Sequence, residues 1–211
     1  MHFSRLLLAL ALLAPVSLAG GCGGGQAATR APLDPNRLAP ARLYPMREGY
    51  VWSFNVDTGT AVPTFTTQRV TRVAGDRMFL RGDSPEEIEY ELRADGLYSV
   101  RNGAYLLQTP IAVGAHWTSG HGRTATVGSV TEALEVRGTA YEGCVRIEEE
   151  NPQAGTTVVT TYCPDVGPVL ILSRQDLSIG EGRSLTVRAE LLGLTRGEED
   201  AEAPLEDPGP G

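Results

Sequence analysis

The chain has 211 residues and a formal net charge of −8, and all 18 of its basic residues are arginine. No basic stripe interrupts this acidic balance, which argues against nucleic acid as a partner. No stretch provides the roughly 20 consecutive apolar residues that a membrane-spanning helix needs, so the sequence predicts no transmembrane segment.

Residues 1–21 are predicted to be a signal peptide, with Arg5 as the positive region and residues 6–14 as a short apolar run. The stretch "LAGGC" resembles the lipobox of bacterial lipoproteins, which predicts lipid attachment, with palmitate among the acyl chains, at Cys22. Ala19 stands where Leu is common in that motif. Ordinary cleavage after Ala19, which would leave Cys22 as a free thiol, is therefore the alternative.

Two segments flank the predicted folded domain. Residues 22–43 are rich in Gly, Ala and Pro without apolar periodicity, which predicts a lipidated Cys followed by a flexible tether. Residues 197–211 contain six acidic residues and no basic one, which predicts a disordered acidic tail. The remaining residues 44–196 are enough for one domain with a substantial core.

Apolar and polar residues alternate along several short stretches of this domain, as is typical of half-buried strands. Residues 51–57, 88–92, 145–148 and 185–191 show the pattern, and no segment sustains a helical period. The predicted fold is all-β: an antiparallel curved sheet, half-barrel or barrel-like, built from two β-meander halves.

One spacing of Pro, Gly and Trp occurs twice, at Pro45, Gly49 and Trp52 and again at Pro110, Gly114 and Trp117. We interpret each occurrence as the start of one β half, with the Trp as the first large core residue. Chance recurrence and a pair of Trp that grips a ligand remain alternatives.

Residues 88–108 predict a three-stranded meander. A three-residue loop at 94–96, with Gly96 left-handed, and a two-residue turn at Asn102-Gly103 give a fully apolar inner face. That face would consist of Ile88, Tyr90, Leu92, Tyr98, Val100, Tyr105 and Leu107.

Cys144 and Cys163 flank a second hairpin whose turn is "NPQAG". A symmetric register places Cys144 opposite Cys163 and Val145 opposite Tyr162, a separation that suits a disulfide. Export would put both residues in an oxidising compartment. We therefore predict a disulfide, with two buried free thiols as the alternative.

No pattern of catalytic or metal-binding residues stands out. His116 and His121 have no carboxylate or Cys at metal-ligand spacing, and no Gly-x-Ser-x-Gly nucleophile elbow occurs. The sequence thus predicts no enzyme, no metal and no cofactor.

Three stretches together resemble an uncharacterised family of Gram-negative bacterial lipoproteins: "YPMREGYVW", "YEGCVRIEEE" and "YCPDVGPVLIL". The resemblance implies an antiparallel β fold, similar to that of envelope lipoprotein carriers, without assigned catalytic residues. Pro168 departs from the family's pattern and indicates a strand start or an edge strand.

These observations predict a non-catalytic lipoprotein of the cell envelope, held at the membrane by its N-terminal lipid, whose β domain scaffolds or binds a partner protein. The alternative is a carrier of a lipid or other hydrophobic ligand in an apolar cleft. Gly23 after the Cys fits sorting to the outer membrane, facing the periplasm or the cell surface.

Overall fold

The computed structural model describes residues 35–177 and 184–197. The predicted signal peptide, the lipid-attachment residue Cys22 and the predicted acidic tail beyond Gly197 lie outside these residues. Within them, no helix is both long and apolar enough to cross a bilayer.

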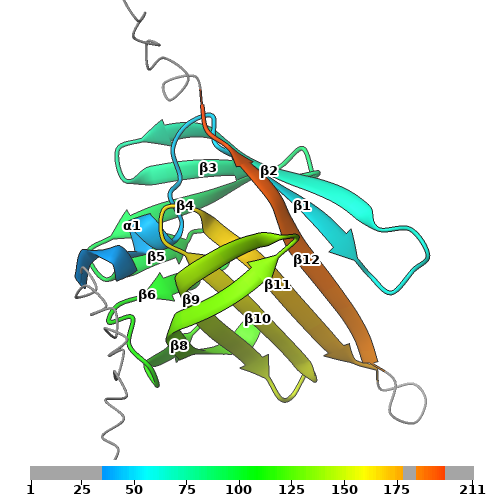
Figure 1. The fold of residues 1–211 in the computed structure, drawn as a ribbon. Coiled ribbons are helices and arrows are strands. Elements are labelled where there is room, and N and C mark those ends of the chain that lie inside the picture. Colours follow the sequence, from blue (N-terminus) through cyan, green and yellow to red (C-terminus); the bar gives the residue numbers. More distant parts are fainter. Residues whose placement is uncertain (1–34, 178–183, 198–211) are drawn as a thin grey trace, which may run out of the picture. The chain divides into compact units, whose positions relative to one another are not determined.

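Twelve antiparallel strands in the described ranges form one sheet, which curls into a nearly closed barrel with one unsealed seam (Figure 1). This confirms the predicted all-β fold. Strands that are neighbours in the chain pair with each other except β6 and β7, which are the edges at the seam, and β1 also pairs with β12. The strands are β1 (Val51–Asp57), β2 (Thr64–Ala74), β3 (Arg77–Arg81), β4 (Glu87–Arg93), β5 (Gly96–Ser99), β6 (Ala104–Gln108), β7 (His116–Thr118), β8 (Thr124–Val136), β9 (Thr139–Asn151), β10 (Thr156–Cys163), β11 (Gly167–Asp176) and β12 (Ser184–Thr195).

The two Pro-Gly-Trp segments share the backbone structure around their glycines, at the start of β1 and of β7, although the bond before Pro110 is cis and the bond before Pro45 is not. Gly49 and Gly114 have φ angles of 82° and 84°, values that favour glycine. Each donates its amide to a valine carbonyl on the next strand, Gly49 to Val70 and Gly114 to Val127, both at 2.9 Å. The recurrence is therefore structural, and it marks two halves of six strands each.

Both Trp side chains belong to the core. Trp52 is fully buried and Trp117 is 6% exposed. Each indole donates a hydrogen bond to a backbone carbonyl, Trp52 to Val166 at 2.6 Å and Trp117 to Tyr105 at 3.1 Å. Because neither ring is free, the alternative of a ligand-gripping Trp pair is wrong.

Residues before β1 close one end of the barrel. The expected tether extends to residue 43, but residues 35–43 are folded, as η1 (Pro35–Leu38) and α1 (Pro40–Leu43). The helix contacts β5 and β11 from the two halves of the sheet. Leu43 is fully buried there, so its burial offsets part of the ordering entropy that a free tether would keep. We call this the closed end. The opposite end, where β1 finishes and β12 begins, is called the mouth.

The predicted disulfide between Cys144 and Cys163 is present, with the two α-carbons 4.2 Å apart. Val145 lies opposite Tyr162, as the symmetric register requires. The disulfide joins β9 to the end of β10, next to the loop at residues 164–166. Gly167 and Pro168 then begin β11, which agrees with the strand start that Pro168 indicated.

The predicted register of the meander is wrong by one residue at β5. Leu92 pairs with Leu97 and Glu91 with Tyr98, so Leu97 faces the core and Tyr98 faces out. The outer face accepts Tyr98 because the Arg93 guanidinium stacks 3.5 Å from its ring and Glu91 pairs with Arg93. A tyrosine ring beside a guanidinium gains a cation–π interaction, and its polar tip can remain in water.

Two further details of the meander differ from the prediction. Tyr105 pairs with Tyr98 on the outer face, whereas Leu107 is buried, because a bulge shifts the register of β6. Val100 lies 42% exposed in a turn that spans residues 100–103, which replaces the two-residue turn. Gly96 has a positive φ of 155°, which favours glycine, and it begins β5 instead of closing a three-residue loop. Gly96 is also required for close strand approach, since a Cβ there would lie 2.2 Å from the Leu107 carbonyl oxygen.

Candidate functional site

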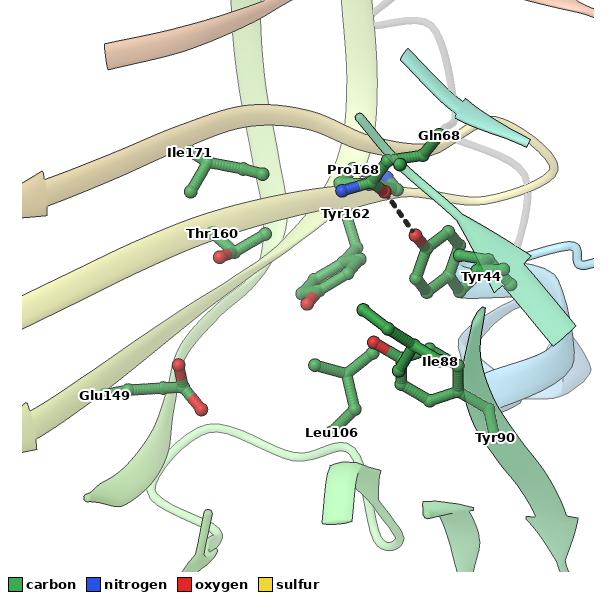
Figure 2. A pocket seen from close by; sticks show the side chains of 12 residues that line it. Tyr44, Gln68, Ile88, Tyr90, Leu106, Glu149, Thr160, Tyr162, Pro168 and Ile171 are labelled. Atoms are coloured by element: carbon green, nitrogen blue, oxygen red, sulfur yellow. Dashed lines mark hydrogen bonds between the residues drawn. The ribbon is translucent and has the colours of Figure 1, made fainter. Parts of the chain in front are cut away.

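The barrel interior keeps a cavity of about 200 Å³ between the closed end and the mouth (Figure 2). Aliphatic residues from both halves form much of its wall, together with three tyrosines, one amide and one carboxylate. The lining residues are Tyr44, Gln68, Leu80, Gly82, Ile88, Tyr90, Leu106, Glu149, Thr160, Tyr162, Pro168 and Ile171.

Strand register explains why these side chains point inward. Directly opposed residues in antiparallel strands share a face of the sheet. Gln68 lies opposite the buried Trp52, and Thr160 lies opposite both Ile147 and Ile171. Since Trp52 and Ile147 are in the core, their partners face the interior as well.

The three cavity tyrosines come from distant parts of the chain. Tyr44 follows α1 and donates its hydroxyl hydrogen to Gln68 Oε1 at 2.8 Å, as Figure 2 shows. Burial raises the pKa of Tyr44, Tyr90 and Tyr162 above the usual tyrosine value. The phenols therefore stay neutral at physiological pH and offer hydrogen bonds without charge.

Glu149 on β9 supplies the one carboxylate of the cavity wall. Its carboxylate faces the cavity in Figure 2, and its side chain is only 13% exposed. The Nε atom of Arg123 lies 3.4 Å from Glu149 Oε2, so a neighbouring cation balances the charge. The carboxylate also contributes, after burial, to the raised pKa of Tyr162.

Between the cavity and the mouth, the inner wall is largely aliphatic. Val56 and Thr64 lie opposite each other on β1 and β2, and Val56 also lies opposite Ala189 on β12. Val187, two residues before Ala189, shares its inward direction. These valines are only half-buried, and Leu185 nearer the mouth is 47% exposed. An apolar surface thus leads from the mouth to the cavity.

The side chains of the site are suited to binding. Phenols, an amide and aliphatic side chains can hold an apolar group and make hydrogen bonds to one polar end. No group of three potential metal ligands occurs within residues 35–177 and 184–197. His116 and His121 are exposed, on β7 and on the short η2 helix (Gly120–Gly122).

The sequence did not identify this cavity. Alternation predicts Tyr90 and Ile88 on an inner face, but no pattern in the sequence points to Tyr44 or Gln68 as cavity residues. Gln68 interrupts the apolar alternation of its strand, and Tyr44 lies in the segment between the expected tether and the first strand. Only closure of the sheet brings them together, so no spacing along the chain marks them.

A comparison with protein-family models finds no match to this sequence, and neither does a comparison with curated proteins. The lipoprotein family indicated by three short motifs therefore stays a prediction.

Solved structures of loose similarity include a candidate lipoprotein from Parabacteroides distasonis, with a TM-score of 0.41, 12% identity and coverage of 72% of this chain and 98% of the other. A candidate exported protein with a YmcC-like fold from Bacteroides fragilis gives a TM-score of 0.38 at 12% identity, with the same coverages of 72% and 98%. MucB gives a TM-score of 0.35 at 16% identity, over 81% of this chain and 62% of MucB. At these TM-scores the likeness is too loose to transfer an activity to this chain.

Proposed function

We propose that this protein is a non-catalytic binding protein of the cell envelope, which is exported and anchored through Cys22. Its barrel interior receives a hydrophobic ligand. The observation that carries the proposal is the aliphatic and tyrosine-lined cavity with an apolar wall leading to the mouth. A barrel built only for stability would be expected to fill such a space with side chains.

The size of the cavity limits the ligand. A volume of about 200 Å³ corresponds to the liquid volume of roughly seven waters and lies below the range of about 300–1,000 Å³ that is typical of drug-sized ligands. The cavity therefore suits one end of a single acyl chain, with the rest of the chain lying along the wall toward the mouth. The tyrosine hydroxyls and Gln68 would meet a weakly polar group.

The test is binding of fluorophore-labelled palmitate to the purified protein, combined with native mass spectrometry for lipid that co-purifies. Ile171 lines the cavity and is half-buried, so I171F would fill part of the space. We expect I171F to weaken binding by about tenfold, the equivalent of losing roughly two buried methylenes.

The neighbouring variant L172F is the matched control, because Leu172 lies opposite Arg188 on the outer face. Equal palmitate affinity in I171F and L172F would reject the interior as the binding site. Absence of both co-purified lipid and palmitate binding in the wild-type protein would reject the ligand-binding function.

A partner protein held at the membrane is the second candidate function, and exposed apolar residues near the β1–β2 connection favour it. Val62 is 75% exposed and Phe65 is 61% exposed. Phe65 lies opposite Asn55 on the outer face, away from the cavity. A V62S/F65S variant that loses a specific envelope partner, while I171F keeps it, would favour this function over ligand binding.

Membrane anchoring has its own test. Replacing Cys22 by Ser removes the only thiol outside the disulfide, and we expect the C22S protein to leave the membrane fraction. Unchanged membrane retention of C22S would reject the anchor without affecting the interior site.

A further inference from the structure

A second hollow lies at the closed end, outside the cavity described above. The turn at residues 47–50, the end of β12 and the loop between β10 and β11 meet around a volume of about 270 Å³. Its lining is small and strongly polar, and consists of Pro45, Arg47, Tyr50, Asp165 and Arg196.

The backbone holds the two arginines close together. Val51 on β1 pairs with Thr195 on β12, so Arg196 follows directly at the edge of the turn. A Cβ on Gly49 would lie 3.3 Å from the Gly197 α-carbon, which means that the strand end packs closely on the turn. The turn itself is closed by a hydrogen bond from the Tyr50 amide to the Arg47 carbonyl at 3.0 Å.

Asp165 does not neutralise these two arginines, because it is already engaged by Arg42. Arg42 Nε donates to Asp165 Oδ1 at 2.9 Å, and Arg42 Nη2 donates to Oδ2. The backbone amide of Asp165 also donates to the Arg42 carbonyl at 2.7 Å. These bonds from Arg42 are the main reason that the Asp165 pKa lies below its usual value, and Arg196 and Arg47 lower that pKa further through their charge.

Arg47 and Arg196 therefore line the hollow with positive charge that no carboxylate of the described residues pairs with. Both side chains are exposed. In the part of the chain that the structure describes, neither guanidinium lies within 4 Å of a carboxylate. Among the described residues, Asp165 is the one carboxylate that lines the hollow beside Arg47 and Arg196, so positive charge is in excess there.

We propose that this hollow binds a phosphate group. Guanidinium groups match the oxygen geometry of phosphate and form charge-assisted hydrogen bonds with it, and an excess of positive charge suits a phosphate anion. Free phosphate and an anionic lipid headgroup both carry this chemistry. The site lies outside the barrel interior, so it stands whether or not the interior binds a ligand.

The test is titration of inorganic phosphate into the full-length mature protein carrying C22S, followed through the arginine Nε–Hε signals by NMR. We expect saturable shifts at Arg47 and Arg196, and affinity weakened by at least about tenfold in R47Q/R196Q, as the loss of charged hydrogen bonds implies. R101Q is the matched control, because Arg101 is exposed and pairs with Glu86 away from the hollow. R47K/R196K keeps the charge without the fork geometry and should bind with intermediate affinity.

Vesicles distinguish the two sources. If a lipid headgroup is the ligand, the C22S protein should co-sediment with phosphatidylglycerol vesicles but not with phosphatidylcholine vesicles, and R47Q/R196Q should abolish the difference. If free phosphate is the ligand, phosphate binds and neither vesicle does.

Three results would overturn the proposal. One is the absence of both saturable phosphate shifts and vesicle preference. Another is wild-type affinity in a folded R47Q/R196Q protein, with the single variant R196Q deciding if the double variant does not fold. The third is phosphate binding that appears only after Glu198, Glu199 and Asp200 are replaced by their amides. That result would mean that the chain's own acidic residues occupy the hollow in place of phosphate.

Discussion

The indole Nε1 of Trp117 donates a hydrogen bond to the backbone carbonyl of Tyr105 at 3.1 Å, and this bond crosses the seam between β7 and β6. These two strands are the edges of the sheet and are not paired with each other by a backbone ladder. A side chain therefore links the two edges of the unsealed seam, where no backbone ladder does. Trp52, its counterpart in the first half, instead fixes the β10–β11 loop through Val166.

Replacing Trp117 by Phe should loosen the seam. Loss of the indole bond is expected to lower the free energy of unfolding by about 1–2 kcal/mol and to speed amide hydrogen exchange in β6. The control is W52F, which loses an equivalent indole hydrogen bond. Because β1 is paired with a strand on each side, this loss does not act on the seam. Faster exchange in β6 for both variants, or for neither, would contradict the assigned role of Trp117.

Several features were predictable because they depend on local pattern. The Cys144–Cys163 register follows from a symmetric turn, and the two Trp positions follow from repeated turn chemistry. The meander was harder, since Leu97 and Tyr98 are adjacent and apolar, so alternation fits either register. Arg93 and Glu91 on the outer face select the observed register of β5, because they make exposure of Tyr98 favourable.

The cavity could not be predicted for a different reason. Tyr44, Tyr90 and Tyr162 come from the segment before β1, from β4 and from β10. Their convergence depends on the curvature of the sheet and on the helix at the closed end. Neither property is encoded in the spacing of residues along one strand.

Removing the disulfide should destabilise the domain. The bond joins residues 19 apart, and closing a loop of this length stabilises by about 3 kcal/mol in the chain-entropy account. In a C22S background, C144S/C163S is expected to lower the urea midpoint. It should also increase exchange in the loop that carries Asp165, because that loop directly follows Cys163. An unchanged midpoint would show that packing alone holds β9 and β10 together.

Stability should fall at alkaline pH. Burial, followed by the charge of Glu149, raises the pKa of Tyr162 above its ordinary value of 10.0. The unfolded chain loses this proton first, so stability is complete below pH 10.0 and decreases as the pH rises toward the folded-state pKa. Y162F lacks the ionisable hydroxyl and should show a shallower alkaline loss in urea titrations.

Y98F is the control for this alkaline effect, because Tyr98 lies on the outer face beside Arg93. It is expected to keep the alkaline profile of the wild-type protein. An equally steep loss in Y162F and the wild-type protein would assign the alkaline sensitivity to other groups.

Gly96 should tolerate no side chain. A Cβ there would lie 2.2 Å from the Leu107 carbonyl oxygen and 3.0 Å from the Gln108 α-carbon, and both are backbone atoms that can move only if β6 moves. We expect G96A to lower the free energy of unfolding by about 2–4 kcal/mol. G193A is the matched control within a strand, since a Cβ at Gly193 meets nothing within 4 Å, and its effect should stay within about 0.5 kcal/mol. The measurement is urea unfolding of the two variants. Equal stability of G96A and G193A would mean that β5 and β6 are not packed as closely as the structure has them. The register that places Leu97 in the core would then be wrong.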